Sequence, residues 1–293
     1  MVLGDASNAE IINCDSIQVY KDLHIGSAKL PPENRGGIPH HLIDLLEIDE
    51  ELTAGQYARL AREALSSVRS RGHLPIVVGG TGFYLRALLD GLSPAPSRDP
   101  ALRTRLSALA QRRPPALHRF LRQHDPSAAA RIHQHDHQKL IRAIEVTLLS
   151  RSPASQVQAQ PRLGLQGYSV LKIGLAPDRS ALRDHLDRRC AAMFHNGLLE
   201  ETAALLSTGI HPDPKPLQSL GYKQAVAVLN GYSSLEQAIS ECQIKTRQYA
   251  KRQMTWFRAD PAVHWLPGFG SNPDVQQAAL ALLRDFLSRF SSS

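Results

Sequence analysis

Residues 74–92 read LPIVVGGTGFYLRALLDGL, and this stretch decides the fold. Its first part, LPIVV, is a short apolar run of the kind that forms a buried strand. Two glycines then open TGFYLRALLDG, which we expect to be a helix. A buried strand that leads through a glycine-rich turn into a helix is typical of a parallel sheet covered by helices. Ligands bind such sheets at the carboxyl ends of the strands, which makes Thr81 a candidate site residue.

The residues before this stretch repeat the pattern. AEIINC (residues 9–14) is a second short apolar run, predicted to be a buried strand whose carboxyl end presents DSIQVY. Residues 53–71 have apolar side chains on one helical face, and Gly72 is a natural stop. Asp15 therefore follows one predicted strand as Thr81 follows the other. We expect the two side chains to face a common cleft.

The residues after it change character. Asp99 and Pro100 are a helix cap and a first-turn proline, and the chain reads as helical from there to about Ser150. Residues 152–167 are polar and contain proline and glycine, which predicts a mobile connector. We then expect a strand around Leu171 and a helix capped by Asp178. A capping box at residues 233–236 opens a long helix, and a short strand and a terminal helix follow it. The sequence thus predicts an α/β core (residues 1–96 and 167–293) with a helical insertion at residues 97–166.

Composition narrows the class of protein. The 293 residues are 42% hydrophobic and 21% charged, which is ordinary for a globular protein, and no run approaches the length of a membrane span. The start carries no signal-peptide pattern and the three cysteines imply no disulfide framework, so we expect a cytoplasmic protein. The formal charge of +7 favours a polyanionic partner such as RNA, provided that the charges are suitably placed.

Cations and aromatic residues alternate near the end of the long predicted helix. Tyr249 and Trp256 stand seven residues apart among Lys245, Arg247, Lys251, Arg252 and Arg258. Phosphates attract the cations, and unstacked bases stack on aromatic rings. The pattern predicts an RNA-binding surface. The alternative is a solvated basic face whose aromatic rings lie in the core.

Five blocks, in this order, carry a family resemblance: DSIQVYKDLHIGSAK (15–29), PHHLID (39–44), PIVVGGTGFYLRALLDGL (75–92), LGYKQA (220–225) and TRQYAKRQMTWFR (246–258). Together they resemble the tRNA dimethylallyltransferases, over nearly the whole chain. The resemblance implies a P-loop NTPase-like, mainly parallel α/β core. It also implies transfer of a dimethylallyl group from dimethylallyl diphosphate, with Mg²⁺, to the exocyclic amine of the adenine 3′ of the anticodon.

The resemblance assigns the chemistry to three residues. The adenine amine is a poor nucleophile, so a carboxylate must accept its proton, and Asp15 matches the family's base. Thr81 matches the threonine near the reacting centre, and Arg189 matches an arginine that contacts the diphosphate. Each has a structural alternative: Asp15 as a turn cap, Thr81 as a helix cap and Arg189 as a solvated arginine beside Arg188.

The resemblance also implies contacts with the anticodon stem-loop of tRNA. The matching residues are Asp15, Ser16, Ile17, Gln18, Arg103, Gln138, Lys139, Leu140, Ile141, Arg142, Gly221, Tyr222, Lys223, Lys251, Arg252, Gln253, Trp256 and Arg258. The target base must leave its stack to reach Asp15, so contacts on both sides of the pocket are expected. We expect a monomer. His133, His135, Asp136 and His137 are not expected to bind a metal, because neighbouring positions rarely converge on one ion.

One family motif has no match. The family's phosphate-binding loop has the pattern G-x-x-x-x-G-K-[ST], and the 293 residues do not contain it. We expect the strand, loop and helix that carry it to be missing. Their loss should leave exposed sheet edges and prevent transfer by the chain as given. Either the start was assigned downstream of the true one, which we favour, or the chain is a truncated homologue that only binds tRNA. A different phosphate-transferring enzyme is disfavoured by the RNA-facing final motif.

Overall fold

The computed structural model describes residues 8–208 and 214–290 of the chain, so the first seven residues of the predicted core lie outside the described part. The chain divides into two compact units. The core unit comprises Met1–Leu88 and Gly167–Ser293, and the insertion unit comprises Leu89–Gln166. Within the described residues, no helix is long and apolar enough to cross a membrane.

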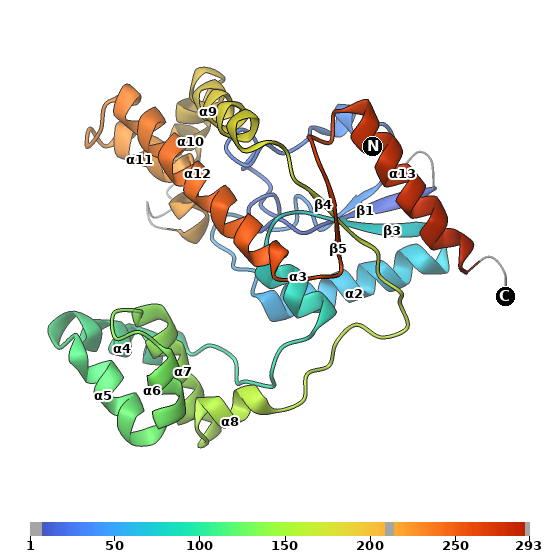
Figure 1. The fold of residues 1–293 in the computed structure, drawn as a ribbon. Coiled ribbons are helices and arrows are strands. Elements are labelled where there is room, and N and C mark those ends of the chain that lie inside the picture. The colour runs from blue at the N-terminus through green and yellow to red at the C-terminus, as the bar shows by residue number, and fades with distance from the viewer. Residues whose placement is uncertain (1–7, 209–213, 291–293) are drawn as a thin grey trace. The chain divides into compact units, whose positions relative to one another are not determined.

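A parallel three-stranded sheet lies at the centre of the core unit (Figure 1). Strand β1 (Ala9–Asn13) pairs with β2 (His40–His41) on one side and with β3 (Leu74–Val78) on the other. Every residue of β1 is buried, including the charged Glu10 and the polar Asn13. The register sets Asn13 opposite Val78, so Asp15 and Thr81 follow neighbouring strand ends. The parallel sheet predicted from the sequence is confirmed.

A second parallel sheet joins β4 (Lys172–Leu175) to β5 (Val263–Leu266). The strand predicted around Leu171 begins one residue later, at Lys172. In the described part of the chain, β3 pairs only with β1 and β4 only with β5. Both strands are only partly buried, and Val78 and Leu175 are 50% and 45% exposed. Apolar strands of parallel sheets are normally covered on both faces. The side chains of β3 and β4 are therefore unusually exposed, at strands that each pair on one side only within the described residues.

Helices α2 (Ala54–Ser70) and α3 (Gly82–Leu89) accompany the first sheet. Thr53 caps α2 in a reciprocal capping box with Gln56, at the start expected from the sequence. The rings of Tyr57 and Tyr84 stack with centroids 4.3 Å apart and join the two helices. This packing fixes the start of α3, where Thr81 leads in from β3.

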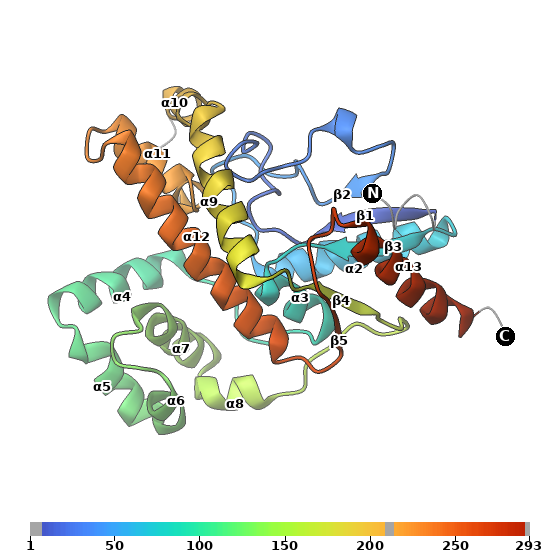
Figure 2. The same cartoon turned by 45° about the horizontal axis from the view of Figure 1, so that its top comes forward.

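Five more helices complete the described part of the core unit: α9 (Arg179–His195), α10 (Leu198–Ser207), α11 (Tyr222–Leu229), α12 (Leu235–Arg258) and α13 (Pro273–Ser288). It also contains the short 3₁₀ turns η1 (Pro32–Asn34) and η2 (Lys215–Gln218). Helices α9 and α12 run side by side (Figure 2). Arg247 of α12 pairs with Asp187 of α9 at 2.6 Å. The capping box of α12 uses Ser234 and Gln237, one residue later than the predicted box at residues 233–236, because Ser234 is the residue with extended backbone at the N-cap.

The insertion unit is a small helical bundle of α4 (Pro100–Arg112), α5 (Pro115–His124), α6 (Pro126–Arg131), α7 (His137–Ser150) and α8 (Ala154–Ala159). Helix α8 occupies part of the segment predicted to be a mobile connector, so that prediction was wrong there. Its Ala154 and Val157 are buried in the bundle's core. The buried carboxylate of Asp125 accepts hydrogen bonds from the Ser155 backbone N–H (2.8 Å) and hydroxyl (2.7 Å) and so holds the helix in place.

Candidate functional site

Asp15 and Thr81 meet at the carboxyl ends of β1 and β3. The Thr81 hydroxyl accepts a hydrogen bond from the Ser16 backbone N–H at 3.0 Å and donates to the Ser16 hydroxyl at 3.4 Å. The Thr81 backbone N–H donates to the carbonyl of Cys14 at 3.2 Å. The hydroxyl therefore links the two strand ends, whereas the alternative predicted that it would cap α3.

The carboxylate of Asp15 is held in a fixed orientation. Its Oδ1 accepts hydrogen bonds from the backbone N–H groups of Ile17 (2.8 Å) and Gln18 (3.2 Å). Asp15 thus caps the turn that follows β1, which is the structural alternative considered above. Oδ1 accepts both hydrogen bonds, so the cap orients the carboxylate without using Oδ2. A turn cap of this kind and a proton acceptor can be one residue.

Helix α12 lies directly against the turn that carries Thr81. The Gln253 side chain donates to the Gly80 carbonyl at 2.9 Å. A Cβ on Gly82 would lie 2.4 Å from the indole nitrogen of Trp256, so only glycine lets the indole come this close. Two residues from the predicted RNA-binding set therefore lie beside a predicted catalytic residue, although the sequence separates them by more than 170 positions.

The aromatic residues of α12 lie at the surface and are paired with cations. Trp256 is 39% exposed, and the guanidinium of Arg86 lies 4.1 Å from the centre of its ring. Tyr249 is 37% exposed, with Arg252 5.6 Å from its ring centre. Burial raises the pKa of Tyr249, and the nearby charge of Asp15 adds to the shift. Hence the alternative that places these rings in the core does not describe this helix.

Free cations accompany these rings. Lys251, Arg252 and Arg258 are exposed, whereas Arg247 is tied to Asp187. Exposed cations beside half-exposed rings are what binding a single-stranded nucleic acid requires.

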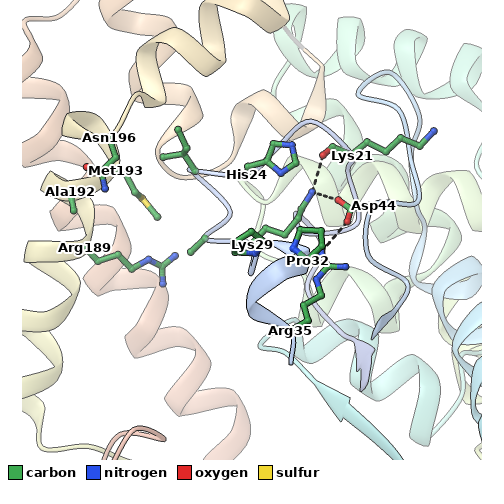
Figure 3. A pocket seen from close by; sticks show the side chains of 13 residues that line it. Lys21, His24, Lys29, Pro32, Arg35, Asp44, Arg189, Ala192, Met193 and Asn196 are labelled. Atoms are coloured by element: carbon green, nitrogen blue, oxygen red, sulfur yellow. Dashed lines mark hydrogen bonds and ion pairs between the residues drawn. The ribbon is translucent and has the colours of Figure 1, made fainter. Parts of the chain in front are cut away.

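Arg189 faces a cavity of about 680 Å³ between α9 and residues 21–44 (Figure 3). On the far side, Lys29 and Arg35 bind the Asp44 carboxylate at 2.6 and 3.1 Å, and Lys29 also donates to the backbone carbonyls of Tyr20 and Lys21. Burial acts to raise the pKa of Asp44, but the hydrogen bonds from these two cations outweigh it and lower the pKa. By contrast, Arg189 has no hydrogen-bond or ion-pair partner in the part of the chain that the structure describes, so its charge remains for an anion.

The predicted RNA-binding residues of the insertion unit differ in their surroundings. Arg103 and Arg142 both bind Oε2 of the fully buried Glu145, at 3.1 and 2.6 Å. Leu140 and Ile141 are buried in the bundle's core, while Gln138 and Lys139 are exposed. Any direct contact of this segment with RNA therefore depends mainly on Gln138 and Lys139.

Tyr222 is fully buried. Its hydroxyl donates to Glu201 at 2.5 Å and accepts from the Gly26 backbone N–H at 3.2 Å. Gly221 is also buried, and only Lys223 of this predicted set is exposed. Glu201 was missed by sequence reasoning, because nothing in GLLEETAALL distinguishes it from its neighbour Glu200.

The distribution of charge is uneven. The insertion unit contains 12 Lys and Arg residues and 5 Asp and Glu residues, while the rest of the chain has 22 of each, so this unit carries the whole net charge of +7. Three of its five acids cap helices and a fourth, Glu145, is buried. Its surface therefore presents mainly arginines, among them Arg105, Arg112, Arg113, Arg119 and Arg122.

No group of three or more His, Cys, Asp or Glu side chains that could hold a metal ion occurs in residues 8–208 and 214–290. Asp136, in the histidine-rich turn, instead caps α7 by accepting from the Lys139 backbone N–H at 3.2 Å, and it pairs with the Lys139 ammonium at 2.7 Å.

Comparison with known proteins gives consistent matches. The family model described as IPP transferase matches residues 18–260. The tRNA dimethylallyltransferase of Solibacter usitatus (strain Ellin6076) is 49% identical over 289 residues, which is 99% of this chain and 94% of that protein.

Solved structures agree with the sequence matches. The full-length tRNA isopentenylpyrophosphate transferase from Bacillus halodurans superposes with a TM-score of 0.70 at 33% identity, covering 99% of this chain and 93% of that one. A eukaryotic dimethylallyltransferase solved in the course of acting on tRNA gives a TM-score of 0.81 at 28% identity, covering 98% of this chain and 75% of that one.

Proposed function

This chain belongs to the IPP transferase family, and from that membership we propose that it is a tRNA dimethylallyltransferase. The reaction transfers the dimethylallyl group of dimethylallyl diphosphate to the exocyclic amine of the adenine 3′ of the anticodon. The observation that carries the proposal is the juxtaposition of Asp15 and Thr81 with the aromatic and basic residues of α12. The 49% identity to a tRNA dimethylallyltransferase over 99% of the chain favours transfer over binding of tRNA alone.

Asp15 acts in this proposal as the general base. The amine nitrogen bonds to C1 of the dimethylallyl group, the bond from C1 to the diphosphate oxygen breaks, and the nitrogen loses a proton to the carboxylate. The bonds from Ile17 and Gln18 hold the acceptor in place while this happens. Thr81, joined to Ser16 at the same strand ends, positions the reacting groups.

Arg189 stabilises the diphosphate as negative charge develops on it. Support comes from its place on the cavity wall and from the absence of a competing acidic partner among the described residues. We propose that Mg²⁺ accompanies the diphosphate, since this ion keeps several waters and is held largely by substrate phosphates. The described residues form no magnesium site by themselves, and we assign none of them to the ion.

The tRNA is bound by two surfaces in this proposal. The basic-aromatic face of α12 receives the unstacked bases near the cleft, and the arginines of the insertion unit contact the phosphates of the stem. The charge distribution supports this division, because the insertion unit carries the whole net charge of +7 while the exposed cations of the core unit beside the proposed base are those of α12. A tRNA substrate supports a cytoplasmic location for the proposed reaction.

Nucleoside analysis of cellular tRNA tests the proposed function. Deleting the gene from its source organism should remove dimethylallylated adenosine from digested tRNA, as measured by liquid chromatography and mass spectrometry, and complementation should restore it. An unchanged level of the modified nucleoside in the deletion strain would contradict the proposal.

A further inference from the structure

Three consecutive backbone N–H groups, those of residues 24–26, are bound by two side chains from distant helices. The Glu201 carboxylate of α10 accepts from His24 (3.2 Å) and Ile25 (3.0 and 3.2 Å). The Tyr222 hydroxyl of α11 accepts from Gly26 at 3.2 Å and itself donates to Glu201 at 2.5 Å. Two of the three backbone donors are thereby satisfied by one charged acceptor, which makes stronger hydrogen bonds than a neutral one.

The loop fits closely against the tyrosine. A Cβ on Gly26 would lie 2.4 Å from the Tyr222 ring, so the backbone rests on the ring face itself. Burial raises the pKa of Tyr222, and the hydrogen bond to Glu201 raises it further, so the phenol remains a donor. The loop cannot be shifted here without breaking several contacts at once.

From this loop a chain of hydrogen bonds leads to Asp15. The carbonyl of Ser27 accepts from the Gln18 side chain at 3.2 Å, and the Gln18 backbone N–H donates to Asp15 at 3.2 Å. The same loop lines the cavity opposite Arg189, where His24, Ile25 and Ala28 lie on its wall. The contacts that Glu201 and Tyr222 make with residues 24–26, together called the anchor, therefore affect the orientation of the proposed base and the wall of the proposed diphosphate pocket.

We propose that Glu201 is a positioning residue for the transfer reaction: it holds residues 24–28 so that Gln18 and Asp15 keep their orientation. The inference rests on the proposed function. Glu201 touches neither substrate in this account and acts only through the loop. Small misplacements of reacting groups can lower rates by about a hundredfold, so a distant anchor can control turnover.

Glu201→Gln tests this with little change in shape. The amide retains one oxygen acceptor and places an NH₂ donor where the other oxygen stood. It therefore loses either the bonds that His24 and Ile25 donate to Oε2 or those that Ile25 and Tyr222 donate to Oε1. The matched control is Glu200→Gln, the same change on the adjacent exposed residue. Both variants are made in the native gene product and measured by hydrogen exchange and by single-turnover transfer of labelled dimethylallyl to tRNA.

We expect Glu201→Gln to speed amide exchange in residues 15–29 and to lower the single-turnover rate about tenfold to a hundredfold, with the KM for tRNA changed less than twofold. Glu201→Asp should recover part of the rate. Glu200→Gln should match wild type in both assays. A Glu201→Gln protein with wild-type exchange in residues 15–29 and a wild-type rate would overturn the inference.

A second variant covers the case in which Glu201→Gln does not fold. Tyr222→Phe removes one link of the anchor and leaves the bonds from His24 and Ile25 in place. It should give a smaller change in the same direction, and a wild-type result for both exchange and rate would also overturn the inference. Failure of the proposed function looks different, since the wild-type protein would then transfer nothing while the loop exchange still responded to Glu201→Gln.

Discussion

Trp256 shows how a single residue joins the two parts of the site. Its indole covers Gly82 at the start of α3 on one side and stacks on Arg86 on the other, and it keeps 39% of its surface exposed. A ring held in this way is pre-organised for stacking with a base. We propose that it stacks on a base next to the target adenine.

Replacing Trp256 with alanine should therefore weaken binding of an anticodon stem-loop. Loss of one base–aromatic stack costs about 1–3 kcal/mol, which is roughly fivefold to a hundredfold in Kd. Fluorescence anisotropy with a labelled stem-loop measures the change. Tyr232→Ala is the control, because this ring is 85% exposed and away from the described site residues, and equal losses in the two variants would exclude a specific stack.

At the same scale, the sequence identified some site residues and not others. Asp15 and Thr81 could be found because each follows an apolar strand pattern, and strand ends of a parallel sheet converge. Tyr222 was predicted to face RNA but is buried, since its role depends on packing against a loop from residues 24–26. Such long-range contacts leave no local pattern in the sequence.

At the scale of elements, Glu10 ties the first sheet to its surroundings. This buried β1 carboxylate binds Arg71 (2.7 Å), His41 (2.5 Å) and His73 (2.6 Å). The hydrogen bond from Arg71 is the largest cause that lowers the pKa of Glu10 to about 2; burial opposes it and the two histidines assist. Because the folded pKa lies below the ordinary value of 4.5, the ionised carboxylate stabilises the fold above about pH 4.5, and this contribution is lost as the pH falls toward 2.

Glu10→Gln should accordingly lower the free energy of unfolding at pH 7 by about 1.5–3 kcal/mol, since it replaces the charge-assisted hydrogen bond from Arg71 with a weaker, neutral one. The variant should also lose much of the decline in stability between pH 4.5 and pH 2. Urea unfolding at pH 7 and pH 3 measures both effects. Glu63→Gln, in the exposed pair with Arg59, should cost about 0.5 kcal/mol or less, and a Glu10→Gln protein as acid-sensitive as wild type would refute this assignment.

Element boundaries were predictable where the caps are local. Thr53, Asp99 and Asp178 start their helices as the sequence predicts, because an N-cap needs only its own side chain and the next turn. Helix α8 was missed because Asp125, thirty residues away, supplies the bonds that hold it. The strand predicted around Leu171 begins at Lys172 instead for a similar reason, since its pairing with β5 decides where it starts.

For the whole molecule, the net charge of +7 lies in the insertion unit, and we expect this charge to set the affinity for RNA. The end of α4 and helix α5 carry four exposed arginines within eleven consecutive positions: Arg112, Arg113, Arg119 and Arg122. Each contact with a phosphate releases counterions, so it appears in the salt dependence of binding.

Replacing these four arginines with glutamine should weaken tRNA binding and reduce the salt slope by about one unit per lost phosphate contact. The same number of exposed cations in the core unit, Arg59, Arg183, Arg284 and Arg289, provides the control. Filter binding across a range of potassium chloride concentrations separates the two sets. Identical slopes for both variants would show that the insertion unit is not the phosphate-binding surface.

The α/β core with its helical insertion could be predicted from the sequence, because apolar runs and helical patterns alternate along the chain. Each of these patterns can be recognised from neighbouring residues alone. What the sequence pattern could not supply is the approach of α12 to the turn between β3 and α3, because it depends on Gly80 and Gly82 meeting Gln253 and Trp256. The family resemblance indicated these residues, and the structure supplies the physical reason for their proximity.

In the proposed function, Asp15 serves as the base of a transfer reaction beside Thr81 and the Gln253 and Trp256 side chains of α12. Asp15→Asn in the native gene product tests it most directly, by single-turnover transfer of labelled dimethylallyl to tRNA beside a measurement of tRNA affinity. The amide can still accept from Ile17 and Gln18 but cannot take the proton, so we predict a rate about a hundredfold or more below wild type and a tRNA Kd within about twofold. Transfer at the wild-type rate by Asp15→Asn, with tRNA bound normally, would contradict the account.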